Sequence, residues 1–326
     1  MSVDGDTDRL FTRIPISIIT GYLGSGKTTL LQEILRERKG EKIALIINEF
    51  GAVNIDAQIL ETSEEEIIEL DNGCICCTVR GDLVPILTRL VEGRLGMRGE
   101  ARHFDRVIIE TSGLADPGPI ITTLYTDAVL SSCYTIDSVI TLVDAVHFDQ
   151  YGTSHESAAQ IAFADTIVIT KGELVSDVAF QSLRSRLQST NQSARILDRR
   201  SVAAGVGALI GTGSFAAIDL PPVTHDHAEH QHDAGVDSVV ISLGAVNLDV
   251  LHEAFSTLLT KYPGDLYRYK GIVAVAGDEQ RYVLQGVREL YSISPDRLWA
   301  EGEERRTLLV LIGRNTESMQ KLFTES

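Results

Sequence analysis

Short apolar runs alternate with helix-length amphipathic segments through the first two-thirds of the chain. Apolar runs of strand length, most of them rich in β-branched residues, occupy positions 14–19, 42–48, 67–70, 107–110, 138–144 and 166–170. Between them, the segments 29–37 and 82–94 repeat apolar residues at helical spacing, and Asp82 is a suitable N-cap for the second helix. Strands that alternate with helices predict an α/β domain whose parallel sheet is covered by helices on both faces.

The pattern changes after position 205. A glycine-rich stretch at 205–213 ends the alternation, and a polar segment with Pro221 and Pro222 follows it. Beyond this segment we predict strands at 238–243, 267–275, 281–287 and 307–312, and helices at 247–261 and 317–323. Closely spaced strands with two helices indicate a small α+β domain. The predicted organisation is a disordered tail at 1–13, a first domain at 14–213, a linker at 214–236 and a second domain at 237–326.

The first apolar run leads directly into a glycine-rich loop. Residues 21–28 read GYLGSGKT, which fits the P-loop pattern G-x-x-x-x-G-K-[ST] at every fixed position. Glycines let backbone N–H groups turn toward phosphate oxygens, and the helix that follows offers its positive N-terminal end. Lys27 can reach the β- and γ-phosphates, and the Thr28 hydroxyl can bind Mg²⁺. This P-loop NTPase motif makes the following residues candidate nucleotide ligands: Gly21, Gly24, Ser25, Gly26, Lys27, Thr28 and Thr29.

Two further segments lie where P-loop proteins sense the γ-phosphate. One is the polar loop 48–56, and the other is the run 107–110, which ends in Glu110 and continues as Thr-Ser-Gly113. A carboxylate at the end of such a strand can hold Mg²⁺ directly or through water, and the Gly113 amide can point at the γ-phosphate. Lys27, Glu49 and Glu110 are therefore candidate catalytic residues, and Thr28 and Glu110 are candidate Mg²⁺ ligands.

Residues 170–173, TKGE, follow a buried run at the place of the N-K-x-D guanine reader. The aspartate of that motif accepts two hydrogen bonds from guanine, and adenine presents no such donor pair. Glu173 keeps the carboxylate on a longer side chain, and Thr170 replaces the amide of asparagine. Thr170, Lys171 and Glu173 are thus candidate base-binding residues, and GTP is the expected nucleotide, although the change from Asp to Glu leaves the guanine preference open.

Three of the four cysteines are crowded together as Cys74-Ile-Cys76-Cys77. Thiolates select zinc, copper(I) or related ions, and three sulfurs leave a fourth position open for exchange. Cys77 lies on the opposite face of an extended segment, so a turn between Gly73 and Gly81 is needed to bring all three together. Zn²⁺ is the expected ion, with Co²⁺, Ni²⁺ and Fe²⁺ as alternatives. Three buried, inert cysteines are the competing interpretation, and Cys133 is expected in the core.

A second potential metal-binding segment lies in the linker. His225, His227, His230 and His232 fall within eight residues, and such tracts bind divalent ions weakly. The alternative is a solvated linker that happens to be rich in histidine. We treat these four residues as weak auxiliary metal ligands.

Charge and targeting signals narrow the class of protein. A formal net charge of −17 argues against a nucleic-acid or anionic-membrane surface, because both require basic patches. Positions 1–13 lack the basic and apolar regions of a signal peptide, and no apolar run approaches the ~20 residues of a transmembrane helix. Few cysteines outside the cluster suit a reducing compartment. We expect a cytoplasmic protein without nucleic-acid or membrane partners.

Taken together, the loop GYLGSGKTT, the segments NEFG and NGCICC, the switch VIIETSGLADP and the small second domain resemble the CobW-like GTPases. That group is related to the nickel-insertion GTPases of hydrogenase and urease and contains zinc-regulated metallochaperones. The resemblance spans about 14–312 and implies GTP hydrolysis coupled to delivery of a metal to a client metalloprotein, with a CobW C-terminal-like second domain. It implies that Cys74, Cys76 and Cys77 bind the metal, while a homodimer is left open. Glu173 departs from the usual Asp of the family.

Two other functions compete with the GTPase metallochaperone. A partitioning-type P-loop ATPase usually carries an extra lysine early in the loop, where this chain has Tyr22 and Leu23. A metal buffer or sensor could instead use nucleotide only to lock a conformation. Turnover separates these functions, because metal-dependent hydrolysis favours the chaperone and negligible turnover with tight metal binding favours the sensor.

Overall fold

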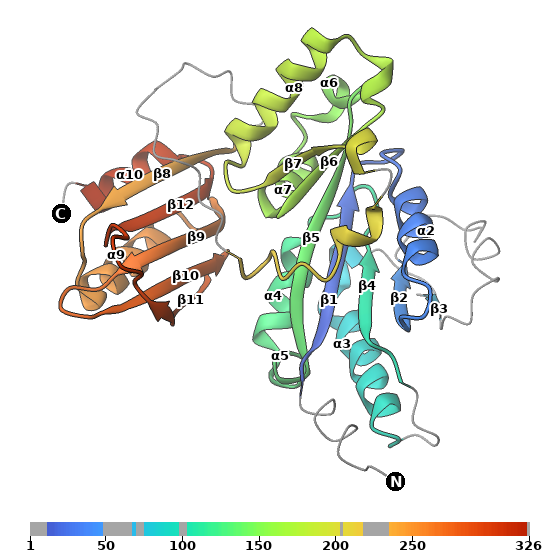
Figure 1. Cartoon of the computed structure of the whole chain (residues 1–326), viewed down its shortest axis with the longest axis horizontal. Coiled ribbons are helices and arrows are strands. Elements are labelled where there is room, and N and C mark those ends of the chain that lie inside the picture. Colours follow the sequence, from blue (N-terminus) through green and yellow to red (C-terminus); the bar gives the residue numbers. More distant parts are fainter. Residues whose placement is uncertain are drawn as a thin grey trace.

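Two β-sheets organise the chain (Figure 1). The computed structural model describes residues 12–47, 67–69, 75–97, 103–202, 205–217 and 235–324, and for 67–69 and 75–82 it describes the backbone. The larger sheet has seven strands in the order β3-β2-β4-β1-β5-β6-β7, and every pairing is parallel. Its strands are β1 (Ile14–Gly21), β2 (Ile43–Ile47), β3 (Ile67–Glu69), β4 (Arg106–Glu110), β5 (Tyr134–Asp144), β6 (Thr166–Thr170) and β7 (Arg195–Asp198).

Helices cover both faces of this sheet, as predicted. The helices are α2 (Lys27–Glu37), α3 (Ile75–Arg94), α4 (Gly118–Thr126), α5 (Ala128–Cys133), α6 (Phe148–Tyr151), α7 (His155–Phe163) and α8 (Asp177–Thr190). Leu87 of α3 and Ile121 of α4 belong to the core on one face, and Leu31 of α2 belongs to the core on the other. The α/β prediction is confirmed. Strand β7 was not predicted, because only Ile196 of its four residues is buried.

Helix α3 differs from the prediction at its start. It begins at Ile75, so Gly81 and Asp82 lie inside the helix and Asp82 is not its N-cap. Glycine costs only about 1 kcal/mol inside a helix, too little to stop one whose later turns bury Leu83 and Leu87 completely. The predicted turn between Gly73 and Gly81 is therefore replaced, from Ile75 onward, by helix.

The second sheet has five antiparallel strands in the order β11-β10-β9-β12-β8. They are β8 (Asp237–Leu243), β9 (Leu266–Ala274), β10 (Gln280–Val287), β11 (Leu290–Leu298) and β12 (Thr307–Gly313). Helices α9 (Leu248–Lys261) and α10 (Thr316–Thr324) lie on one face, and the side chain of Asn247 caps α9 by accepting a hydrogen bond from the Asp249 amide at 2.8 Å. The predicted α+β domain is confirmed. Strand β11 was not predicted, because it is a largely exposed edge strand.

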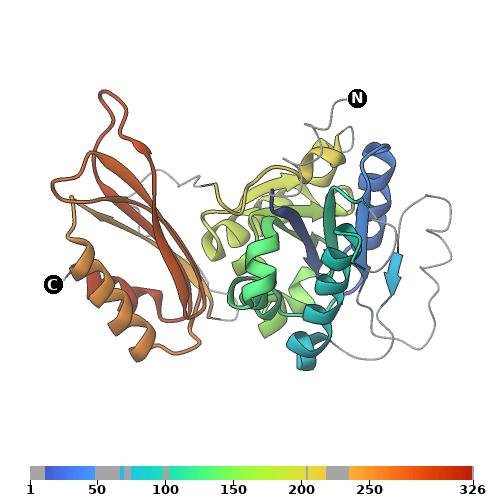
Figure 2. The same cartoon turned by 90° about the horizontal axis from the view of Figure 1, so that it is seen from below.

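The opposite face of the second sheet packs on the larger domain, while its helices lie on the far side (Figure 2). Along β12, Leu309 faces the helices and Val310 joins the core of the larger domain, as period-two alternation requires. Tyr267 of β9 packs edge-on against Phe163 at the end of α7, with ring centroids 5.9 Å apart. The hydrophobic core is thus continuous between the two sheets.

A buried charge cluster lies in this interface. Asp165, in the turn between α7 and β6, accepts hydrogen bonds from Arg268 Nη2 at 2.6 Å and Lys270 Nζ at 2.9 Å. All three side chains are at most 7% exposed. Burial alone would raise the pKa of Asp165, but the charges of Arg268 and Lys270 outweigh it and lower this pKa. The cluster therefore ties the second domain to the first by charge as well as by apolar contact.

We predict that Asp165→Asn destabilises the protein by about 3–5 kcal/mol, because it leaves two cations buried without their carboxylate. The matched control is Asp149→Asn, since the Asp149 side chain is 86% exposed in its pair with Arg186 and such pairs contribute at most about 1 kcal/mol. Urea unfolding measures both variants. Because the folded pKa of Asp165 is lowered, its stabilisation is present above the unfolded value of about 3.9 and is lost as pH falls below it. A penalty equal to that of the control would contradict the prediction.

Candidate functional site

The candidate site lies at the carboxyl edge of the parallel sheet, where four adjacent strands end. Strand β1 ends at Gly21, β4 at Glu110, β5 at Asp144 and β6 at Thr170. The register pairs Ile19 with Glu110 and Asp144 with Thr170, so these ends lie side by side. Ligands of open α/β sheets bind outside such carboxyl ends.

The P-loop forms an open hollow between β1 and α2. Gly24 has φ 74° and Gly26 has φ 95°, both in the left-handed region that favours glycine. A Cβ atom at either position would meet no atom within 4 Å, so both glycines border open space. No side chain caps the N-terminus of α2. The backbone N–H groups of the first helical turn are therefore available to an anion. The loop therefore fits a phosphate group.

The side chain of Lys27 turns back over the P-loop. Its Nζ donates to the carbonyl of Gly21 at 2.9 Å and lies 3.2 Å from that of Tyr22, and the residue is 8% exposed. Tyr22 in turn stacks on Tyr151 of α6, with ring centroids 4.1 Å apart and planes 3° apart. These contacts hold the ammonium group beside the phosphate-sized hollow.

Thr28 and Glu110 come together across the gap between α2 and β4. The Thr28 hydroxyl donates to Glu110 Oε1 at 2.9 Å, and Glu110 is 5% exposed. A hydroxyl and a carboxylate are oxygen ligands of the kind Mg²⁺ prefers. In addition, the buried hydroxyls of Ser25 and Ser112 have no hydrogen-bond partner among the described residues, which suits a polar ligand at this edge. The donor set fits a nucleotide with Mg²⁺.

Gly113 lies against the P-loop. A Cβ atom there would fall 2.6 Å from the backbone nitrogen of Leu23, closer than real Cβ contacts allow. Gln160 of α7 holds this segment from behind, donating to the carbonyls of Gly113 at 3.1 Å and Ala115 at 3.0 Å. The next residue, Asp116, pairs with Arg288 of the second domain at 2.8 Å. The predicted switch thus contacts both the P-loop and the C-terminal domain.

Thr170 turns its hydroxyl toward the P-loop. Its Oγ1 lies 3.0 Å from the carbonyl of Ser25 and 3.2 Å from that of Val143, and the residue is 7% exposed. Its side chain therefore supports the loop and is not presented to a base. Glu173 is exposed in a 3-10 helix at Gly172–Leu174, and Lys171 precedes that helix with φ 57°.

Asp144 is a site residue that the sequence did not single out. Lys171 Nζ donates to Asp144 Oδ2 at 2.6 Å, and His147 Nδ1 lies 2.8 Å from the same oxygen. Burial raises the pKa of Asp144, but the hydrogen bonds from Lys171 and His147 outweigh it and lower this pKa. A carboxylate at the end of a buried strand was the signal that identified Glu110, and it applies equally to Asp144. Here it fixes the side chain of Lys171, which belongs to the predicted base reader.

Several predicted residues lie outside this description. Glu49, Cys74 and the four linker histidines are outside the described residues, and so are the side chains of Cys76 and Cys77, whose backbone is helical. Within the part of the chain that the structure describes, no group of three or more His, Cys, Asp or Glu side chains is placed to hold a metal. None of the described helices is long and apolar enough to cross a membrane. The free thiol of Cys133 packs partly buried against the core.

The fold and the site define a P-loop nucleotide-binding protein with a small antiparallel C-terminal domain. The family model for the CobW/HypB/UreG nucleotide-binding domain matches residues 15–198, and that for the cobalamin synthesis protein CobW C-terminal domain matches 236–324. The chain belongs to this family, and the predicted resemblance is confirmed. It carries a P-loop GTPase domain.

Relatives align along most of the chain. The zinc chaperone YjiA of Escherichia coli (strain K12) is 37% identical over 92% of this chain and 94% of its own length. The zinc chaperone CobW of Sinorhizobium sp is 32% identical over 92% and 93%. A crystal structure of zinc-bound YjiA GTPase from E. coli superposes with a TM-score of 0.75 at 32% identity, covering 96% of this chain and 99% of that one. Both domains are therefore shared with a solved relative.

We predict that Thr170→Val weakens binding of GTP and ATP by the same factor, about fivefold, because one hydrogen bond to the P-loop is lost. By contrast, Glu173→Gln is expected to weaken GTP about tenfold or more and leave ATP unchanged, because only guanine loses a charge-assisted acceptor. Competition with a fluorescent nucleotide measures both affinities. A changed GTP-to-ATP ratio in Thr170→Val would instead assign Thr170 to base recognition.

Proposed function

We propose that this protein is a GTP-hydrolysing metallochaperone that binds zinc and delivers it to a client metalloprotein. One observation supports it above the others. Glu110 and Gly113 converge on the P-loop, where Glu110 accepts a hydrogen bond from Thr28, in a chain 37% identical to a zinc chaperone. The alternative is a zinc buffer or sensor in which nucleotide only locks a conformation.

In this proposal the loop amides from Gly21 to Thr29 bind the phosphates, and Lys27 neutralises the β- and γ-phosphate charge. When bound by Thr28 and Glu110, Mg²⁺ supplies further charge neutralisation of the transferred phosphoryl group. Gly113 supplies an amide at the γ-phosphate, while Glu49 assists in the attack of water. Lys171 and Glu173 hold the guanine base, with Asp144 fixing the position of Lys171.

The zinc site of the proposal is formed by Cys74, Cys76 and Cys77, with the histidines of the linker as an auxiliary collector. Two of these cysteines lie in the first turn of α3. Helix α3 packs against α4, which begins at Gly118, five residues after Gly113. A movement of the segment around Gly113 is therefore transmitted to the helix that carries the cysteines.

We further propose the domain limits 14–213 and 237–326, joined by the linker 214–236. Limited proteolysis tests them, because cleavage concentrates in exposed chain outside packed cores. Cutting confined to positions before 14 and within 214–236 supports these limits.

We predict slow Mg²⁺-dependent hydrolysis of GTP that Lys27→Ala lowers by roughly a hundredfold or more, because a charge-assisted phosphate contact in a partly dry site is lost. The matched control is Lys42→Ala, which removes a lysine at the opposite end of the sheet, just before β2. Phosphate release measures turnover. Faster hydrolysis of ATP than of GTP would contradict the guanine assignment and leave the P-loop intact.

We also predict that zinc affinity differs between the GDP-bound and non-hydrolysable-GTP-bound protein by about 5- to 150-fold, the range of a 1–3 kcal/mol coupling. The double change Cys76→Ser, Cys77→Ser is expected to abolish tight binding, because a hydroxyl replaces a soft thiolate poorly. Cys133→Ser is the control, since Cys133 lies in another helix. Competition with a chromogenic chelator measures the affinity. Equal zinc affinity in both nucleotide states would favour the buffer or sensor.

A further inference from the structure

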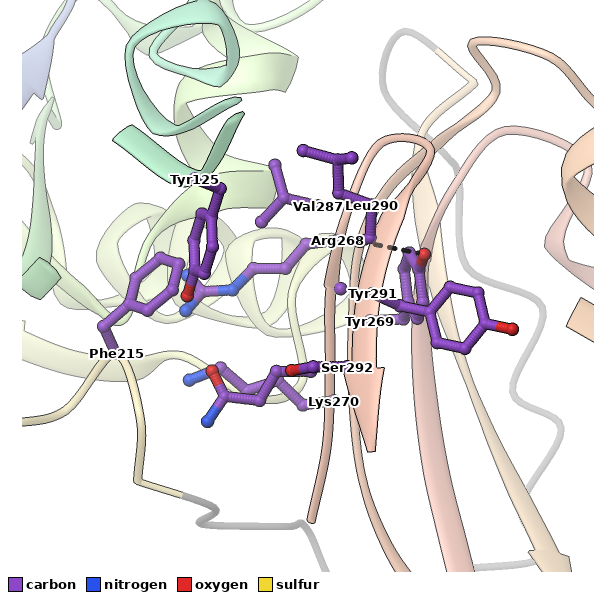
Figure 3. Close-up of a pocket in the computed structure, with 11 residues that line it drawn as sticks. Tyr125, Phe215, Arg268, Tyr269, Lys270, Val287, Leu290, Tyr291 and Ser292 are labelled. Atoms are coloured by element: carbon purple, nitrogen blue, oxygen red, sulfur yellow. Dashed lines mark hydrogen bonds between the residues drawn. The ribbon is translucent and has the colours of Figure 1, made fainter. Parts of the chain in front are cut away.

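A cavity of about 200 Å³ lies between the two domains, away from the P-loop. Its walls come from Tyr125 of α4 and Phe215 on one side, and from β9, β10 and β11 on the other. Figure 3 shows Arg268 extending from the sheet toward Tyr125 and Phe215. Ligand pockets are common at such domain interfaces.

The charged groups of the cavity do not balance. Arg268 and Lys270 both line it, and Asp165 is the only carboxylate with which either forms a hydrogen bond among the described residues. Their remaining described acceptors are neutral carbonyls, those of Phe163 for Arg268 and of Ser214 and Ala217 for Lys270. Among the described residues, Arg268, Lys270 and Asp165 thus carry one net positive charge at the cavity wall, and burying an unbalanced charge is costly.

Two further features indicate that the surroundings of Arg268 and Lys270 do not fully offset their positive charge. Burial and the neighbouring Arg268 together lower the pKa of Lys270 to about 8. The Arg268 guanidinium also rests on the Phe215 ring, 4.4 Å from its centroid, which compensates a cation only partly. Among the described residues the Nε of Arg268 makes no hydrogen bond, whereas Nη1 and Nη2 do. The guanidinium thus retains a donor for an incoming group.

The shape and the remaining walls favour one aromatic ring. An apolar cavity of about 150 Å³ in another protein holds benzene, so about 200 Å³ accommodates a ring with one small substituent. Tyr125 and Phe215 supply aromatic surface, and Val287 and Leu290 supply aliphatic surface. The ring of Tyr291 points away from Tyr125 and Phe215, toward α9 (Figure 3). Tyr125 is 47% exposed and Ser292 is exposed, so the cavity opens to solvent at its rim.

We propose that this interdomain cavity is a binding site for a small aromatic carboxylate. Its carboxylate faces Arg268 and Lys270 and balances their charge, while its ring lies between Tyr125 and the hairpin that joins β10 to β11. A carboxylate oxygen can accept the remaining Nε–H of Arg268 in a charge-assisted hydrogen bond. A monoanion neutralises one excess positive charge, whereas a dianion reverses it. The proposal concerns a different site from the P-loop and does not depend on the proposed GTPase cycle.

The experiment is a fluorine NMR titration of the full-length protein, saturated with GDP and Mg²⁺, at pH 7. The probes are 4-fluorobenzoate, its neutral analogue 4-fluorobenzamide, and 4-fluorophenyl phosphate. We expect the benzoate to bind about tenfold or more tightly than the amide, because only the anion forms charge-assisted hydrogen bonds. The phosphate ester is expected to bind more weakly than the benzoate.

Two variants test the location. Leu290→Trp places a larger side chain in the cavity, and Gln285→Glu adds a carboxylate to its wall; each is expected to weaken benzoate binding about tenfold. Leu298→Trp is the matched control, since Leu298 is 63% exposed on the same strand as Leu290 and does not line the cavity. Thermal melting verifies that each variant is folded. If Leu290→Trp does not fold, the result with Gln285→Glu alone tests the location.

Any of several results would overturn the proposal. They are equal binding of benzoate and benzamide, tighter binding of the phosphate ester than of the benzoate, and benzoate binding that Gln285→Glu leaves unchanged. Failure of 4-fluorobenzoate to bind at millimolar concentration would also overturn it, and the cation cluster would then serve only to dock the two domains.

Discussion

The close approach of the P-loop to the strand ends around it is the constraint on which the site depends. A Cβ atom at Gly21 would lie 2.4 Å from the Leu142 carbonyl, and one at Gly113 would lie 2.6 Å from the Leu23 nitrogen. Neither position tolerates a side chain without moving backbone, so two glycines far apart in sequence set how tightly the loop packs. This packing brings Thr28 within hydrogen-bond distance of Glu110, and the parallel register of β1 with β4 fixes the carboxylate opposite the loop.

The carboxyl edge of the parallel sheet is also connected to the second domain, through an ion pair and an aromatic contact of Arg288. Asp116, two residues before the start of α4, accepts a hydrogen bond from the Gly118 amide, and its other oxygen pairs with Arg288. Arg288 lies over the Tyr267 ring, 4.1 Å from its centroid, so the ion pair is supported by the interdomain core. Since that core is apolar and continuous, the two domains are not expected to hinge freely. A movement of the segment after Gly113 would therefore alter the contact between Asp116 and Arg288 of the second domain.

Local patterns predicted the fold and the P-loop edge, and long-range contacts account for what they missed. The motif around Lys27 and the strand that ends in Glu110 are each contiguous and have fixed spacing, so they could be identified from sequence. Edge strands β7 and β11 bury few side chains and therefore lack the apolar pattern of a strand. Asp165 forms hydrogen bonds with Arg268 and Lys270, which lie 103 and 105 positions away in the sequence. No periodic pattern of residues predicts a contact over such a separation. The hydroxyl of Thr170 likewise reaches a P-loop carbonyl 145 positions away.

The start of α3 bears most directly on how nucleotide and metal sites could communicate. A helix from Ile75 to Arg94 makes the backbone of Cys76 and Cys77 continuous with turns that pack in the core, whereas a separate turn could adjust without disturbing its surroundings. The later turns of this helix pack on α4 and α5, and the Leu87 carbonyl accepts a hydrogen bond from Tyr134 at the start of β5. Packed helices shift as units because cores are dense. A displacement at one end of α3 must therefore be accommodated along its length, against the helix that follows Gly113. This shared packing is a physical route by which the zinc and the nucleotide that we propose to bind would affect each other.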